Sequence, residues 1–220
     1  MAERLPSPSE RSGLLLAVMG IPASGKSTLA HHLAAGIGGT AYLEPEEESW
    51  PQVVLEADSY GQFECLMWFR NTRVPMYIDA ARAARDGQLV VVDSVWDKLY
   101  VRYMSAPCMR WVLASDSPYY EAATAVATAD MVNLPDPDAM VFMKVRESVW
   151  HQLLRRRGRR FDSKSGLSQH YGMQAEMLQA VSAYCQREDI PLLSFPQELL
   201  APEHAVIQVI DGLRALGVRL

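Results

Sequence analysis

The chain has few cysteines and no long apolar run. Its three cysteines, Cys65, Cys108 and Cys185, stand far apart in 220 residues, and no C-x-x-C pair occurs. An odd number of isolated cysteines does not form a disulfide framework or supply the ligand spacing of structural zinc, so we expect reduced thiols in a cytoplasmic protein. The early apolar run at 14–20 is too short to cross a bilayer, and its flanks do not resemble a signal peptide. We therefore expect no membrane association.

Positive charge is also in deficit. Lys and Arg number 21 against 26 Asp and Glu, which gives a formal net charge of −5. This balance argues against a protein that coats nucleic acid without specificity. Five arginines nevertheless occupy the six positions 155–160, within the stretch LLRRRGRRFD. A cluster this dense in an acidic chain calls for a local explanation.

Short apolar runs alternate with longer stretches of helical periodicity from Gly13 onward, whereas residues 1–12 are rich in Pro, Ser and charge. We expect a flexible tail at 1–12 and a single domain over 13–220. The alternation predicts a three-layer α/β fold in which helices cover both faces of a parallel sheet. The predicted strands cover residues 14–19, 41–43, 89–93, 139–145 and 191–195. The predicted helices cover residues 26–37, about 60–85, about 96–105, 117–131, 147–157, 168–188 and 203–216.

The first predicted strand leads into GIPASGKST, which matches the P-loop (Walker A) motif GxxxxGK[ST] between a strand and a helix. In such a loop the backbone N–H groups and the helix N-terminus face nucleotide phosphates. Lys26 would reach the β- and γ-phosphates, and the Ser27 hydroxyl would ligate Mg²⁺. We therefore expect ATP and Mg²⁺ as cofactors. The predicted nucleotide-binding residues are Gly20, Ala23, Ser24, Gly25, Lys26, Ser27 and Thr28.

The loop alone does not distinguish kinases, motor ATPases and switch GTPases. The sequence has no NKxD-type motif for reading guanine, and motor ATPases are usually larger. A small kinase needs only an acceptor site and a lid besides this loop, so we predict phosphoryl transfer to a hydroxyl. A nucleotide-gated binding protein without catalysis is the non-enzymatic alternative.

Two carboxylates follow predicted strands at the edge where open α/β sheets bind ligands. Glu44 is the candidate base that accepts the proton of an attacking hydroxyl, unless it belongs to the solvated acidic run formed by Glu46, Glu47 and Glu48. Asp93 ends the most hydrophobic strand and is the candidate partner of Mg²⁺; the alternative is a cap for the following helix.

The arginine cluster follows the fourth predicted strand and ends a helix. We expect a lid at about 153–167 that closes over the phosphates, with Arg157 and Arg159 on the transferring phosphoryl group. A guanidinium fork suits this task because it bonds two phosphate oxygens at once. The alternative is a solvated basic helix end stabilised by the helix dipole.

These motifs, in this order, resemble the deoxynucleoside kinase family over most of residues 14–195. The stretches EPEEESW, FECLMWFRNTR and VFMKVRESVWHQLLRRRGRRFD are similar to its EP-x-x-x-W segment, its long pocket helix and its RGR lid. The resemblance implies a five-stranded parallel sheet of order 2-3-1-4-5, often in a homodimer, and a nucleoside acceptor. It makes Glu44 the base and Arg157 and Arg159 the lid arginines, which join Lys26 and Asp93 as the predicted catalytic residues. It places Trp50 and Arg73 at the acceptor, and Trp68 and Trp96 are further candidates there.

Three positions depart from the family pattern. Leu66 stands where the family has a base-reading glutamine, Asp93-Ser94-Val95 replaces the E/D-R-S motif, and Leu153 replaces the first lid arginine. The loop GIPASGKS is also similar to that of polynucleotide kinases and related hydroxyl kinases.

These departures keep other acceptors open. The alternatives are a phage-type DNA kinase acting on the hydroxymethyl group of a modified pyrimidine such as 5-hydroxymethyluracil, in the host cytoplasm, and a polynucleotide-end kinase. For a modified base in DNA, Arg155, Arg156 and Arg160 would hold the flanking DNA phosphates, while Trp50, Trp68, Trp96 and Tyr100 could stack the flipped base.

Overall fold

The computed structural model describes residues 12–199 and 201–220. In this part of the chain, five strands form one parallel sheet in the order β2-β3-β1-β4-β5, which confirms the expected α/β class and strand order. The strands are β1 (Leu14–Met19), β2 (Thr40–Tyr42), β3 (Leu89–Val92), β4 (Ala139–Val145) and β5 (Leu192–Gln197).

The central strand β1 contributes to two separate cores. Leu15, Ala17 and Met19 face one hydrophobic cluster, and Leu16 and Val18 face the other. Successive side chains of a strand point to opposite faces, so an uninterrupted apolar run is what a strand needs when both faces are covered.

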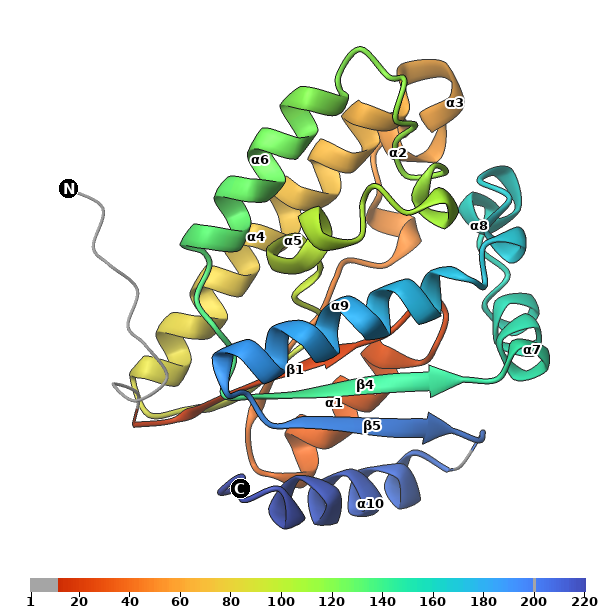
Figure 1. The fold of residues 1–220 in the computed structure, drawn as a ribbon. Coiled ribbons are helices and arrows are strands. Elements are labelled where there is room, and N and C mark those ends of the chain that lie inside the picture. Colours follow the sequence, from red (N-terminus) through yellow and green to blue (C-terminus); the bar gives the residue numbers. More distant parts are fainter. Residues whose placement is uncertain (1–11, 200) are drawn as a thin grey trace.

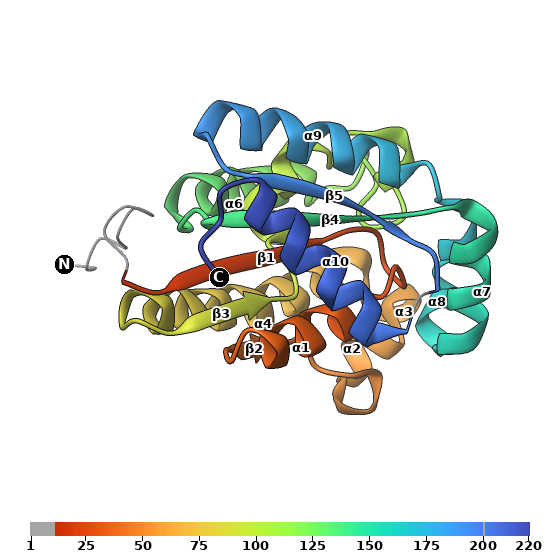
Figure 2. The same cartoon turned by 90° about the horizontal axis from the view of Figure 1, so that it is seen from below.

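Helices cover both faces of the sheet (Figure 1). On one side lie α4 (Gln62–Arg85), α5 (Trp96–Leu99), α6 (Tyr120–Asn133) and α9 (Met173–Glu188). On the other lie α1 (Lys26–Gly36) and α10 (Pro202–Ala215), and Figure 2 shows α10 crossing this face. The remaining helices are α2 (Gln52–Leu55), α3 (Ala57–Tyr60), α7 (Glu147–Arg157) and α8 (Arg160–Lys164). Helix α7 follows the carboxyl end of β4, so the arginine cluster lies at the ligand-binding edge of the sheet.

Two predicted helices are shorter than their apolar periodicity suggests. The helix expected at 96–105 ends at Leu99 and continues as a 3₁₀ turn, Tyr100–Arg102, and the helix expected at 168–188 begins only at Met173. A 3₁₀ turn also buries every third residue, so the spacing of apolar residues does not separate it from an α-helix.

Three further observations concern the N-terminal segment, the cysteines and the character of the helices. Of the expected tail, residues 1–11 lie outside the described residues, while the Ser12 hydroxyl donates a 3.0 Å hydrogen bond to the carbonyl of Arg85. The three cysteines are free. Among the described helices, none has the length and apolar character that crossing a membrane requires.

Candidate active site

The P-loop between β1 and α1 depends on two glycines. Gly20 has φ of 149° and Gly25 has φ of 90°, both in the region that side chains with a Cβ rarely adopt. A Cβ on Gly20 would also lie 2.8 Å from Ser24 Oγ and 3.0 Å from the backbone oxygen of Met143. The loop therefore curls tightly before α1 begins at Lys26, and the N-terminus of this 11-residue helix offers positive potential to an anion.

Ser27 and Asp93 lie in direct contact at the end of the loop. The Ser27 hydroxyl donates a hydrogen bond to Asp93 Oδ2, while the buried Oδ1 of Asp93 has no hydrogen-bond partner. A carboxylate and a hydroxyl are hard oxygen ligands of the kind Mg²⁺ prefers. Within residues 12–199 and 201–220, no group of three or more His, Cys, Asp and Glu could hold a metal. These residues therefore fit a Mg²⁺ ion that takes most of its ligands from phosphate and water.

A cavity of about 330 Å³ extends from the P-loop to the helices above the sheet. One end is lined by Gly20, Pro22 and Lys26, and Glu44 lies beside them. The size falls within the range of small-molecule sites. The rest of the wall is mostly apolar or aromatic and includes Trp50, Val54, Cys65, Leu66, Phe69, Trp96, Trp111 and Phe161.

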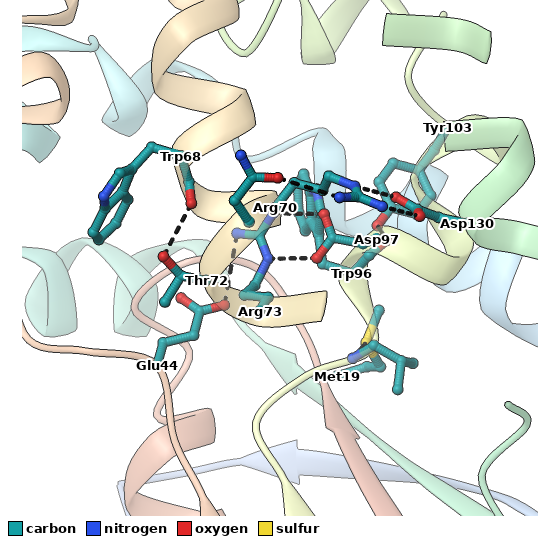
Figure 3. Close-up of polar contacts among 12 residues, drawn as sticks. Met19, Glu44, Trp68, Arg70, Thr72, Arg73, Trp96, Asp97, Tyr103 and Asp130 are labelled. Carbon is teal, nitrogen blue, oxygen red and sulfur yellow. Dashed lines mark hydrogen bonds and ion pairs between the residues drawn. The ribbon is translucent and has the colours of Figure 1, made fainter. Parts of the chain in front are cut away.

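Glu44 and Arg73 line the cavity, and Asp97 behind Arg73 completes a connected polar group (Figure 3). Arg73 is bound at two points to Asp97, through Nε–Oδ2 at 2.7 Å and Nη2–Oδ1 at 3.0 Å. Its Nη1 lies 3.7 Å from Glu44 Oε1. Burial raises the pKa of Glu44 and the charge of Asp93 raises it further, while Arg73 and Lys26 lower it. A carboxyl group held near cations with a raised pKa is suited to accept a proton from a hydroxyl.

The same arginine is held by aromatic rings and by the packing of α4. Its guanidinium carbon lies 5.5 Å from the centre of the Phe69 ring and 5.9 Å from that of Trp96. One turn earlier, Arg70 forms a second two-point pair with Asp130 of α6, at 2.8 and 2.6 Å. These contacts fix α4 against α5 and α6, so the Arg73 guanidinium is held in place at the cavity.

The arginine cluster divides into two sets. Arg157 and Arg159 line the cavity, whereas the side chains of Arg155, Arg156 and Arg160 are exposed. Arg157 is paired with Asp162 through Nε–Oδ2 at 2.9 Å and Nη2–Oδ1 at 2.6 Å. Burial lowers the pKa of Arg157, and Asp162 raises it. The rotation of α7 separates Arg157 from Arg155 and Arg156, and the turn at Gly158 that ends α7 separates Arg159 from Arg160.

Arg159 lies over the Trp50 ring, 5.1 Å from its centre, and its Nη2 bonds Glu46. Glu47 Oε1 accepts a 3.1 Å hydrogen bond from the backbone N–H of Phe161. Of the run predicted to be solvated, Glu46 is exposed although it bonds Arg159. Glu47 departs from the prediction, because it is half-buried and accepts the Phe161 N–H. Glu48 is exposed.

No protein-family model matches the sequence, and no curated protein matches it. Solved structures do. The deoxyadenosine kinase of M. mycoides with bound dATP is 15% identical, covers 91% of this chain and 100% of its own, and has a TM-score of 0.64. Thymidylate kinase from Candida albicans is 13% identical (93% of this chain, 92% of its own, TM-score 0.58). Thymidylate kinase from Ehrlichia chaffeensis is 14% identical, covers 95% of this chain and 100% of its own, and has a TM-score of 0.53. This chain has the fold of these kinases. The resemblance to deoxynucleoside kinases thus holds at the level of the fold.

Within this kinase fold, most residues predicted for the acceptor lie at the cavity, with two exceptions, Trp68 and Tyr100. Trp50, Arg73 and Trp96 line it. Trp68 does not: it packs against Phe69 with ring centres 5.1 Å apart, and Phe69 takes the place at the wall. Neighbouring helix residues differ by about 100° in direction, so the sequence alone left the choice between them open.

The structure also identifies residues that the sequence reading did not. Asp97 pairs with Arg73, and Asp162 pairs with Arg157. Trp111 lines the cavity from a turn and Phe161 from the five-residue helix α8, and both segments are too short to show a periodic pattern. Asp97 stands four residues after Asp93, which was a usable signal for a second acid near the strand end, but its partner on α4 was visible only in three dimensions.

Proposed function

We propose that the chain transfers the γ-phosphoryl group of ATP to a hydroxyl of a nucleoside-type acceptor. The observation that carries this proposal is the position of Glu44 in a single cavity, with Lys26 at the phosphate end and Arg73 at the acceptor end. A phosphotransferase needs this order of groups, because the hydroxyl must lie between its base and the γ-phosphorus. The similarity of the fold to deoxyadenosine and thymidylate kinases supports the same assignment.

In the proposed reaction, Glu44 accepts the proton of the acceptor hydroxyl. The hydroxyl oxygen forms a bond to the γ-phosphorus as the bond from that phosphorus to the β–γ bridging oxygen breaks, which leaves ADP. Lys26 binds the β- and γ-phosphate oxygens, and the lid arginines 157 and 159 stabilise the charge on the transferring group. Mg²⁺ held near Ser27 and Asp93 would neutralise charge on the same phosphates.

The acceptor end of the cavity favours a flat, partly polar molecule. Trp50, Phe69 and Trp96 supply aromatic faces there, and Arg73, held in place by Asp97, supplies the main polar group. The side chain of Leu66, which also lines the cavity, has no group that could hydrogen-bond to the acceptor. A nucleoside base would stack on the aromatic residues and meet one polar edge, which is the combination that such a pocket binds.

A second candidate is a hydroxyl kinase acting on a polynucleotide, either on a hydroxymethylated pyrimidine or on a chain end. The observation that favours it is the exposure of Arg155, Arg156 and Arg160 on the segment that forms one wall of the cavity. Three free guanidinium groups beside an acceptor site could bind flanking phosphates, and binding would then weaken steeply with salt.

One assay separates these acceptors. The protein is incubated with Mg²⁺ and γ-labelled ATP and offered free deoxynucleosides, unmodified DNA with free ends, and DNA containing 5-hydroxymethyluracil. The proposal expects label on free nucleosides. Label only on DNA would exclude the nucleoside kinase in favour of the second candidate. Comparison of the two DNA substrates then shows whether the modified base or the chain end is phosphorylated.

Variants of the phosphate site test whether any enzyme is present. Lys26→Ala should lower turnover at least about a hundredfold with little change in stability, since oxyanion-type contacts are worth this much in the transition state. The exposed Arg160→Ala is the matched charge control for free nucleosides. If wild-type protein binds ATP but transfers phosphate to no hydroxyl, the nucleotide-gated binding protein becomes the better description.

A further inference from the structure

The lid segment 157–162 is already docked on the acceptor side of the cavity through the acidic segment that follows β2. Arg159 bonds Glu46, and the N–H of Phe161 bonds Glu47. The rings of Trp50 and Phe161 meet edge to face with centres 5.6 Å apart. These contacts join residues more than a hundred positions apart in sequence, so they hold the lid against the loop that carries the proposed base.

The contact of Arg159 with Glu46 occupies a guanidinium group that the proposed reaction needs. A carboxylate and a phosphate use the same planar fork, so the two compete for Arg159. The Glu46 side chain is 68% exposed and that of Arg159 is 19% exposed. Glu46 can therefore return to water at small cost, while Arg159 keeps its place over Trp50.

We propose that Glu46 and Glu47 are positioning residues of the lid, an inference that rests on the proposed function. Glu47 holds the lid backbone at Phe161. Glu46 holds Arg159 over Trp50 until the phosphates of the donor nucleotide displace the carboxylate. Donor binding thus frees the acidic segment from the arginine, and the segment carries Glu44 and Trp50 of the acceptor site.

The competition is tested by binding, which requires no knowledge of the acceptor. Calorimetry measures the dissociation constant of a non-hydrolysable ATP analogue with Mg²⁺ for wild type, Glu46→Gln and Glu48→Gln. Removing the competing charge should tighten binding about two- to fivefold, the range of a partly exposed ion pair. Glu48→Gln loses the same charge from an exposed residue of the same run and should bind like wild type.

The partner of Glu46 is tested by a double-variant cycle. In an Arg159→Ala background, Glu46→Gln should leave the dissociation constant unchanged, because the group for which the two anions compete is gone. Equal effects of Glu46→Gln with and without Arg159, or equal effects of Glu46→Gln and Glu48→Gln, would overturn the inference.

The role of Glu47 predicts a change in water exclusion. Glu47→Ala removes the acceptor of the Phe161 N–H and should raise ATP hydrolysis without acceptor severalfold, because water then replaces the hydroxyl as the attacking group and yields ADP and phosphate. If Glu47→Ala hydrolysed ATP no faster than Glu48→Ala, the proposed role of Glu47 in excluding water would be contradicted. Failure of the proposed function is recognised separately, by a wild-type protein that binds the analogue yet phosphorylates no acceptor.

Discussion

Arg73 of α4, which lines the cavity, forms a buried two-point ion pair with Asp97 of α5, with Nε–Oδ2 at 2.7 Å and Nη2–Oδ1 at 3.0 Å. The side chains are only 10% and 8% exposed. The same guanidinium lies 3.7 Å from Glu44. Asp97 therefore positions the cation that faces the proposed base, although it is separated from Arg73 by 24 residues in sequence.

Asp97→Asn should destabilise the protein by about 3 kcal/mol, because removing one partner leaves a buried guanidinium charge uncompensated. The midpoint of thermal unfolding measures this loss. Asp79→Asn is the matched control, since the Asp79–Arg82 pair is exposed on the same helix, with side chains 62% and 57% exposed, and should change stability by less than about 0.5 kcal/mol. Equal shifts in the two variants would show that the buried pair stabilises the fold no more than the exposed pair does.

The rate of phosphoryl transfer should fall as pH decreases through the pKa of Glu44. Burial raises that pKa above the ordinary value of a glutamate, so the carboxylate that acts as base is lost at a higher pH than for a free side chain. The pH profile of kcat/KM should therefore show an acidic limb whose midpoint lies above the ordinary pKa of a glutamate. Glu44→Gln should retain binding of the ATP analogue, lower turnover strongly and remove this limb. Survival of the limb in the variant would assign it to another group.

Asp93→Asn should lower the apparent affinity for Mg²⁺. The carboxylate contacts Ser27 and has one buried oxygen without a partner, so it is placed to bind the ion or its water. Titration of turnover with Mg²⁺ should show a half-saturating concentration at least about tenfold higher, as for groups that orient a metal site. Chelation by EDTA should abolish transfer in the wild type. Activity in EDTA would argue against a metal-assisted reaction.

Gly20→Ala should impair the P-loop. At φ of 149°, a Cβ would be strained and would lie 3.0 Å from the backbone oxygen of Met143, which costs on the order of 1–3 kcal/mol. Binding of the ATP analogue and thermal stability should both decrease. Gly172→Ala is the control, because Gly172 has φ of −55° and open space at its Cβ, so it should be neutral or slightly stabilising. Similar losses in both variants would show that the positive φ and the crowding at Gly20 are not what the P-loop requires.

The sequence by itself determined the sheet class, the phosphate loop and the position of the arginine cluster after the fourth strand. Strands buried on both faces require continuous apolar runs, and GIPASGKST between such a run and a helix specifies the loop locally. Glu44 and Asp93 could be placed at one edge because the carboxyl ends of parallel strands lie together. These inferences depend on patterns within a few residues, which one sequence contains in full.

Only the tertiary structure decided which side chains meet. The choice of Phe69 over Trp68 depended on how α4 is rotated against the sheet. The pairing of Asp97 with Arg73, and of Glu46 with Arg159, depended on segments 24 and 113 residues apart being brought into contact. Local sequence fixes the direction of a side chain relative to its own helix or strand, whereas packing fixes that element relative to all others, and the charged contacts of this site follow from the packing.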